Sequence, residues 1–255
     1  MKNVILCADD YGQNTAISQA IIDLLVLNRL SAVSCLVTAP GWLHDAPLLH
    51  PFKDQADMGL HFNLTDGEHC DSLSRLLIKS HLRLLNKKTL IAECHAQIDQ
   101  FVAGMGYLPD FIDGHQHVHQ LPVIRDALIA VYDARLRQKK SYIRCVDRPH
   151  VWKRFNEKSF LKQAILQLCG AHAFRQLLVK NTIPHNASFA GIYDFNDDLP
   201  YPILFQRFLK QVEGGGLIMC HPGKLSSDAR DPISDARVLE YEYLVKRDVT
   251  ESEGP

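Results

Sequence analysis

An acid and three histidines fall within seven consecutive residues of this chain, Asp113-Gly114-His115-Gln116-His117-Val118-His119. Neutral imidazole is the commonest protein ligand for transition metals, and carboxylates bind the same ions. If residues 111–118 form a strand, side chains two apart share a face, so the acid and the histidines would point the same way. The segment therefore predicts metal binding, and its alternative is a solvated, histidine-rich turn.

Titratable residues also end three other apolar runs. Asp9 and Asp10 follow residues 4–8, His61 lies near the end of residues 56–63, and His221-Pro222-Gly223 follow residues 217–220. Taken singly, each has an ordinary explanation, such as a satisfied histidine or acids that favour a helix N-terminus. Because a barrel gathers the carboxyl ends of its strands on one face, the four segments together predict a single site.

The residue types at these four strand ends suit metal-assisted hydrolysis. One carboxylate and two imidazoles bind a divalent ion at three points and leave positions open for water and substrate. Such an ion lowers the pKa of bound water and polarises a carbonyl group. A second carboxylate that stays off the metal can act as general base, and Asp9 and Asp10 would supply one carboxylate of each kind.

Strand and helix patterns alternate along the whole chain. Runs typical of buried strands occupy residues 2–8, 32–38, 56–63, 111–118 (with the histidines), 142–146 (with Arg144), 188–192 and 217–220. Apolar residues recur at helical spacing in residues 17–25 (capped by Asn14 or Thr15), 42–49, 90–105 (ended by Gly104 and Gly106), 121–136, 160–178, 201–212 and 237–244. This alternation predicts a parallel sheet, and at this length an α/β fold of the distorted (β/α) TIM-like barrel type.

No repeat or inter-domain linker interrupts the pattern, so a single catalytic domain is expected over residues 1–255. Residues 66–88 look like an irregular excursion able to cover a site, and residues 250–255 like a frayed tail. The formal net charge of -1 favours neither nucleic acid nor a membrane surface as partner. The seven cysteines show no C-x-x-C spacing, and neither a signal peptide nor a membrane-length apolar run is present, which predicts a cytoplasmic protein.

The four segments also carry a family resemblance. Ala8-Asp9-Asp10-Tyr11-Gly12, Gly59-Leu60-His61-Phe62-Asn63-Leu64-Thr65, the seven residues from Asp113 and His221-Pro222-Gly223 resemble, in order, four blocks of the YdjC-like family of carbohydrate deacetylases, which includes the chito-oligosaccharide deacetylases. The resemblance implies a distorted barrel of the glycoside hydrolase/deacetylase type and a metal-dependent hydrolase that removes the N-acetyl group of an amino sugar or short oligosaccharide. Tyr11 stands where the family usually has Phe.

By matching positions, the resemblance implies that Asp10, His61 and His115 bind one divalent metal ion and that Asp9 is the general base. The ion would be Mg²⁺ or Zn²⁺, with Mn²⁺ and Co²⁺ as alternatives, because all four accept such a ligand set.

Other residues are assigned from the chemistry of amide cleavage. The departing amine needs a proton, and His221 is the strand-end candidate for the acid. Arg144 is expected either to hold Asp9 ionised or to form a structural ion pair elsewhere. Asp113, His117 and His119 are expected to contact the substrate or to lie behind the metal ligands.

Two other functions compete with deacetylation. The first is another metal-dependent amidohydrolase or a phosphoesterase, although such enzymes normally carry their H-x-H pair on the first strand, where this chain has Asp9 and Asp10. The second is a non-catalytic metal- or sugar-binding protein that uses the three clustered histidines, which leaves the paired aspartates unexplained. The expected partner is a small N-acetylated sugar, and a homodimer is the working expectation for the assembly.

Overall fold

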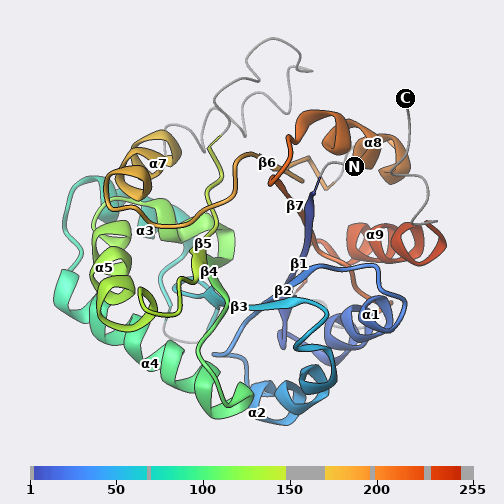
Figure 1. Cartoon of the computed structure of the whole chain (residues 1–255), viewed down its shortest axis with the longest axis horizontal. Coiled ribbons are helices and arrows are strands. Elements are labelled where there is room, and N and C mark those ends of the chain that lie inside the picture. The colour runs from blue at the N-terminus through green and yellow to red at the C-terminus, as the bar shows by residue number, and fades with distance from the viewer. Residues whose placement is uncertain (1–2, 68–69, 148–169, 196–198, 227–230, 248–255) are drawn as a thin grey trace.

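The computed structural model describes residues 3–67, 70–147, 170–195, 199–226 and 231–247. Seven strands form one sheet in the order β5-β4-β3-β2-β1-β7-β6, and every pairing is parallel. The strands are β1 (Ile5–Tyr11), β2 (Ala32–Cys35), β3 (Asp57–Phe62), β4 (Phe111–Gly114), β5 (Tyr142–Ile143), β6 (Phe189–Ala190) and β7 (Leu217–Cys220). Figure 1 shows that this sheet curls round a central axis, which confirms the predicted distorted (β/α) barrel.

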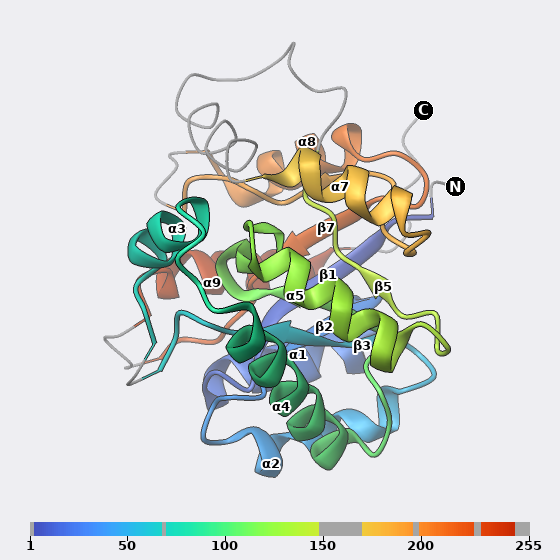
Figure 2. The same cartoon turned by 90° about the vertical axis from the view of Figure 1, so that its left-hand side faces the viewer.

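Helices surround the curled sheet on its outer side (Figures 1 and 2), and α4 and α5 lie next to each other there. The α-helices are α1 (Thr15–Val26), α2 (Trp42–Asp45), α3 (Leu73–His81), α4 (Lys87–Met105), α5 (Ile124–Val131), α7 (Ala171–Lys180), α8 (Tyr201–Gln211) and α9 (Ser234–Lys246). Two 3₁₀ segments, η1 (Ala46–Phe52) and η2 (His115–Gln120), and a π-helical turn, η3 (Tyr132–Leu136), complete the described elements. None of these helices is long and apolar enough to span a bilayer.

The two edges of the sheet meet through a short seam. Ile143 at the end of β5 donates its backbone N–H to the carbonyl of Pro184 at 2.9 Å and forms an isolated parallel bridge with His185. Beyond it, the side-chain amide of Asn186 accepts from the N–H of Cys145 at 2.7 Å and donates to the carbonyl of Cys145 at 2.8 Å. A side chain thus supplies the donor and acceptor that a strand neighbour would provide, and the edge of β5 is covered.

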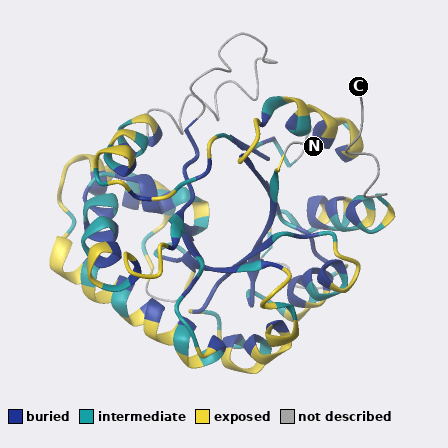
Figure 3. Cartoon of the chain, in the orientation of Figure 1, coloured by how far each residue is buried: buried dark blue, intermediate teal, exposed yellow. Residues whose placement is uncertain are grey.

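The barrel strands are almost entirely buried, whereas the helices expose their outer faces (Figure 3). Gly59 on β3 pairs with Phe111 on β4, and Phe111 pairs with Tyr142 on β5. The rings of Phe111 and Tyr142 stack with centroids 5.0 Å apart, and a Cβ atom at Gly59 would lie 2.4 Å from ring atoms of Phe111. Glycine is therefore required at position 59 because the neighbouring ring occupies the volume of its missing side chain.

Several predicted element boundaries were wrong. Strand β1 runs through Asp9 and Asp10 to Tyr11 instead of ending before them, and β5 ends at Ile143, so Arg144 lies just beyond the strand. Gly104 does not end α4 but lies inside it, because the absence of a side chain there admits Trp42. Pairing of Tyr11 with Cys35 on β2 extends β1 past the two aspartates.

Other predictions were confirmed at least in part. Asn14 caps α1, accepting the backbone N–H of Ile17 at 3.0 Å. The excursion at residues 66–88 is not wholly irregular, because it contains α3. The helix predicted over residues 160–178 is described only from α7 onward, and the predicted tail at residues 250–255 lies outside the described residues.

Substituting Gly59 with Ala should lower the free energy of unfolding by about 1–3 kcal/mol, the usual cost of overpacking a core, because the new methyl group would overlap the Phe111 ring. Urea denaturation measures this. Gly214→Ala is the matched control, since a Cβ there would have no heavy atom within 4 Å. Equal stability of the two variants would contradict the packing account, and adding Phe111→Leu to Gly59→Ala should recover part of the loss.

Candidate active site

The histidine segment is not the extended strand that its alternating pattern predicted. Strand β4 ends at Gly114, and the chain turns at once into the 3₁₀ segment η2, where Gln116 and His117 have positive φ values of 52° and 59°. The turn folds back so closely that a Cβ atom on Gly114 would lie 2.9 Å from the backbone nitrogen of His119. The prediction that Asp113 and the three histidines share one strand face is therefore wrong, and each has a different environment.

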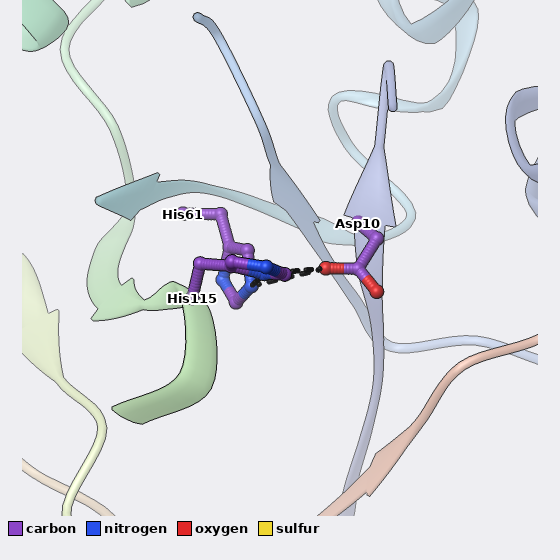
Figure 4. A group of neighbouring side chains, drawn as sticks. All are labelled: Asp10, His61 and His115. Atoms are coloured by element: carbon purple, nitrogen blue, oxygen red, sulfur yellow. Dashed lines mark hydrogen bonds and ion pairs between the residues drawn. The ribbon is translucent and has the colours of Figure 1, made fainter. Parts of the chain in front are cut away.

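Three of the predicted site residues nevertheless come together (Figure 4). Asp10 on β1, His61 on β3 and His115 at the start of η2 place one atom each at the corners of a small triangle. Asp10 Oδ1 lies 3.2 Å from His61 Nε2 and 3.1 Å from His115 Nδ1, and the two nitrogens are 3.3 Å apart. Asp10 and His61 are each 2% exposed, and the side chain of His115 is 13% exposed.

This triangle has the dimensions of a three-point metal site. Ligand atoms about 2.1 Å from one ion stand roughly 3.0 Å apart at right angles and roughly 3.4 Å apart at the tetrahedral angle. The observed separations of 3.1–3.3 Å fall between these limits. A second cluster of potential ligands, Cys7, Asp9 and Asp113, lies in the same interior, but an arginine already engages it. Of the two clusters found in the described part of the chain, the triangle is the one that fits an ion.

Asp113 lies behind His61 and fixes its ring. The Nδ1–H of His61 donates to Asp113 Oδ1 at 2.7 Å, and Ser34 on β2 donates to the same oxygen at 2.5 Å. This contact leaves Nε2 of His61 as the nitrogen that faces Asp10. Burial would lower the pKa of His61, but the charge of Asp113 and the hydrogen bonds to Asp10 and Asp113 outweigh it and raise the pKa to about 10. The site is therefore electronegative and attracts a cation.

The expected contact between Arg144 and Asp9 is present. The guanidinium donates from Nη1 to Asp9 Oδ2 and from Nη2 to Asp9 Oδ1, both at 2.6 Å, and Nη2 also lies 2.6 Å from Asp113 Oδ2. Arg144 is fully buried, and Cys7 Sγ accepts from its Nη2 at 3.0 Å. Burial disfavours the charge, yet the charges of Asp113 and Asp9 raise the pKa of Arg144 well above its ordinary value, so the buried ion pair persists.

Asp10 occupies a strained position in β1. Its φ is +68°, and the register between β1 and β2 shifts between Ala8 and Tyr11, as at a β-bulge. At this irregularity two adjacent carboxylates have different partners, Asp9 contacting Arg144 and Asp10 contacting the imidazoles. Burial would raise the pKa of Asp10, but the charge of Arg237 and hydrogen bonds from His115 and His61 lower it well below the ordinary value.

His221 follows β7 and lies at the same end of the barrel. Its backbone N–H donates to Glu240 Oε2 at 2.6 Å, and its ring packs edge-on against Phe195 with centroids 5.3 Å apart. Burial lowers the pKa of His221 to about 4, although the charges of Asp10 and Asp9 partly oppose the shift. The imidazole is therefore neutral near pH 7.

His117 and His119 do not join the triangle. The Nε2–H of His119 donates to the carbonyl of Arg144 at 2.9 Å, which ties η2 to the residue that holds Asp9. His117 packs edge-on against Phe189 with centroids 5.7 Å apart. Burial lowers the pKa of both rings, that of His119 to about 4. The expectation that the two residues contact the substrate or lie behind the metal ligands stays a prediction.

Three residues around the site were not predicted from the sequence: Ser34, Arg237 and Glu240. Ser34 places a hydroxyl group inside the apolar run of β2, which is only a weak sequence signal for a site residue. Arg237 and Glu240 are one turn apart on α9, and both are buried. Charged residues on a helix usually face solvent, so only their shared three-residue spacing hinted at an inward face.

The fold resembles a solved structure from Enterococcus faecalis, that of a candidate cellobiose-phosphate cleavage protein. The TM-score is 0.71 at 20% sequence identity, and the match covers 98% of this chain and 93% of the other. This likeness independently supports the barrel architecture.

Relatives that match this chain in sequence are named carbohydrate or chitooligosaccharide deacetylases. A Serratia marcescens chitooligosaccharide deacetylase is 25% identical over 97% of this chain and 90% of its own length. A Danio rerio carbohydrate deacetylase is 31% identical over 50% of this chain, and a Halalkalibacterium halodurans one is 28% identical over 52%. These last two matches span only 45% and 62% of the relatives' own lengths.

A family model matches almost the entire chain. It is described as the YdjC-like protein, and the match extends over residues 3–252, which includes all four segments that contribute to the site. On this evidence, the chain belongs to the YdjC-like family.

Proposed function

We propose that this protein is a metal-dependent carbohydrate deacetylase that hydrolyses the acetamide of an N-acetylated amino sugar or short chito-oligosaccharide and releases acetate. The observation that carries the proposal is the triangle of Asp10 Oδ1, His61 Nε2 and His115 Nδ1 beside a separate carboxylate, Asp9, held by Arg144. Relatives named carbohydrate and chitooligosaccharide deacetylases support the substrate class.

Asp10, His61 and His115 would hold one divalent cation. Zn²⁺, Mn²⁺ and Co²⁺ accept two imidazoles and a carboxylate readily, whereas Mg²⁺ more often takes oxygen ligands alone. When bound, such an ion polarises a carbonyl group and makes coordinated water more acidic. The protein itself fixes the ligand orientation, because Asp113 holds the His61 ring from behind.

Asp9 is proposed as the general base that accepts a proton from the attacking water. A base must be correctly oriented, and the two-pronged contact with Arg144 fixes the orientation of the Asp9 carboxylate. Because the same guanidinium contacts Asp113, one buried cation aligns the base and, through Asp113, the metal ligand His61.

His221 is proposed as the acid that protonates the departing amine. Its backbone is fixed by Glu240, and it lies close enough to Asp9 and Asp10 for their charges to act on its pKa. With a pKa of about 4 it is uncharged at pH 7, so it must gain a proton during the cycle before donating one. His117, at the same end of the barrel, is the next candidate.

Acetate release from N-acetylated mono- and disaccharides tests the function. The metal-loaded protein should release acetate, and a chelator should abolish the release. Added Zn²⁺ or Mn²⁺ should restore it, because in this proposal the bound ion polarises the carbonyl group of the amide. Phosphate-ester substrates run beside the sugars address the rival class. Turnover of phosphate esters alone, or metal binding with no turnover of any substrate, would refute the proposal.

Asp9→Asn and Asp10→Asn form a matched pair of adjacent substitutions with different expected results. Asp9→Asn should retain metal but reduce turnover by roughly 10²- to 10⁴-fold, because the amide cannot accept the proton. Asp10→Asn should lose metal, as should His61→Ala and His115→Ala, which elemental analysis of the purified proteins measures. Exposed His44 gives a control, His44→Ala. Full metal content in Asp10→Asn, or near-normal turnover by Asp9→Asn, would contradict the assignments.

His221→Ala should reduce the catalytic rate on N-acetyl sugars by roughly 10²- to 10⁴-fold, with little change in the Michaelis constant. The reason is that an amine leaves poorly without a proton, whereas 4-nitrophenolate leaves without one. Hydrolysis of 4-nitrophenyl acetate by the same variant should therefore be nearly unaffected. If His221→Ala hydrolyses both substrates more slowly by the same factor, His221 is not the acid. The same two substrates should then be compared with His117→Ala.

A further inference from the structure

Arg237 on α9 extends a buried side chain to the metal ligand Asp10. Its Nη2 donates to Asp10 Oδ2 at 2.7 Å and to the side-chain oxygen of Gln13 at 3.0 Å. Its Nε donates to Asp231 Oδ2 at 2.7 Å. Arg237 is only 3% exposed, so these contacts form in an interior where charge interactions are strong.

The stem of Arg237 is held in place by the turn that follows β7. The N–H of Gly223 donates to the carbonyl of Arg237 at 3.1 Å. A Cβ atom on Gly223 would lie 3.0 Å from Cβ and 3.1 Å from Cδ of Arg237. The glycine of the His221-Pro222-Gly223 segment thus leaves room for the arginine, which links the fourth sequence motif to α9.

The contact divides the two oxygens of Asp10 between two tasks. Oδ1 faces the nitrogens of His61 and His115, whereas Oδ2 is occupied by Arg237. Rotation of the carboxylate to offer both oxygens to an ion would break the charge-assisted bond to Arg237, and the buried guanidinium would keep its ion pair with Asp231 alone. The geometry therefore favours a single-oxygen ligand.

We propose that Arg237 is a positioning residue of the metal centre, which holds Oδ2 of Asp10 so that Oδ1 alone is presented to the ion. The inference rests on the metal site of the proposed function. It assigns to α9 a part in metal binding, beyond covering the barrel.

A purely structural role would give a different result. Arg237 could simply dock α9 on the barrel, in which case any substitution that loosens α9 would disturb the site equally. Leu244, on the same helix and 1% exposed, contributes to that docking and makes no hydrogen bond to Asp10. Leu244→Ala is therefore the matched control.

The experiment measures the dissociation constant of Zn²⁺ by competition with a chromophoric chelator for the full chain and three variants. Arg237→Gln should weaken binding by about 10- to 100-fold, the usual effect of removing a residue that supports a metal ligand. Arg237→Lys should recover part of the affinity, because an ammonium group can still donate to Oδ2. Leu244→Ala should lower the unfolding midpoint but leave Zn²⁺ affinity unchanged.

Unchanged Zn²⁺ affinity in Arg237→Gln, or an equal loss in Leu244→Ala, would overturn the inference. Failure of the unaltered chain to bind Zn²⁺ would overturn it together with the metal centre. If Arg237→Gln binds Zn²⁺ weakly as expected while the unaltered protein releases no acetate, the positioning role stands and only the proposed deacetylase activity fails.

Discussion

The fully buried guanidinium of Arg144 lies between Asp9 on β1 and Asp113 on β4, two strands that are separated in the sheet by β2 and β3. A buried cation must be paired, and Arg144 has two buried carboxylate partners. Removing Arg144 would leave both carboxylates without their counter-charge, and breaking a buried ion pair in this way typically costs about 3–5 kcal/mol. The contact therefore ties distant strands together across the barrel interior. Asp9, and His61 through Asp113, take their positions from this one group.

The charge balance of the interior follows from the same arrangement. Two arginines, Arg144 and Arg237, contact four aspartates, which are Asp9, Asp113, Asp10 and Asp231. The aspartates outnumber the arginines, so the pocket retains an excess of negative charge that a divalent cation can balance. The elevated pKa of His61 reflects this excess, because without a metal a proton is the available counter-charge.

The sequence predicted the parts of the site that depend on local pattern. Polar residues at the ends of apolar strands are visible without a structure, which is why Asp10, His61 and His115 could be grouped in advance. The turn after Gly114 could not be predicted, because residues other than glycine rarely adopt positive φ and the alternating pattern of residues 113–119 suits a strand.

Long-range partners were equally invisible to local pattern. Arg237 reaches Asp10 across 227 residues of chain, and Ser34 reaches Asp113 across 79. Likewise, Asn186 closes the barrel with its side chain instead of a strand. That seam bears on local stability: β5 and β6 have only two residues each, so few backbone hydrogen bonds hold this part of the described sheet, and it should open at a lower free energy than the longer pairings of β1. Because Arg144 stands between the seam residues Ile143 and Cys145, opening of the seam would move the backbone that carries the guanidinium, and the contacts of Arg144 with Asp9 and Asp113 resist such an opening.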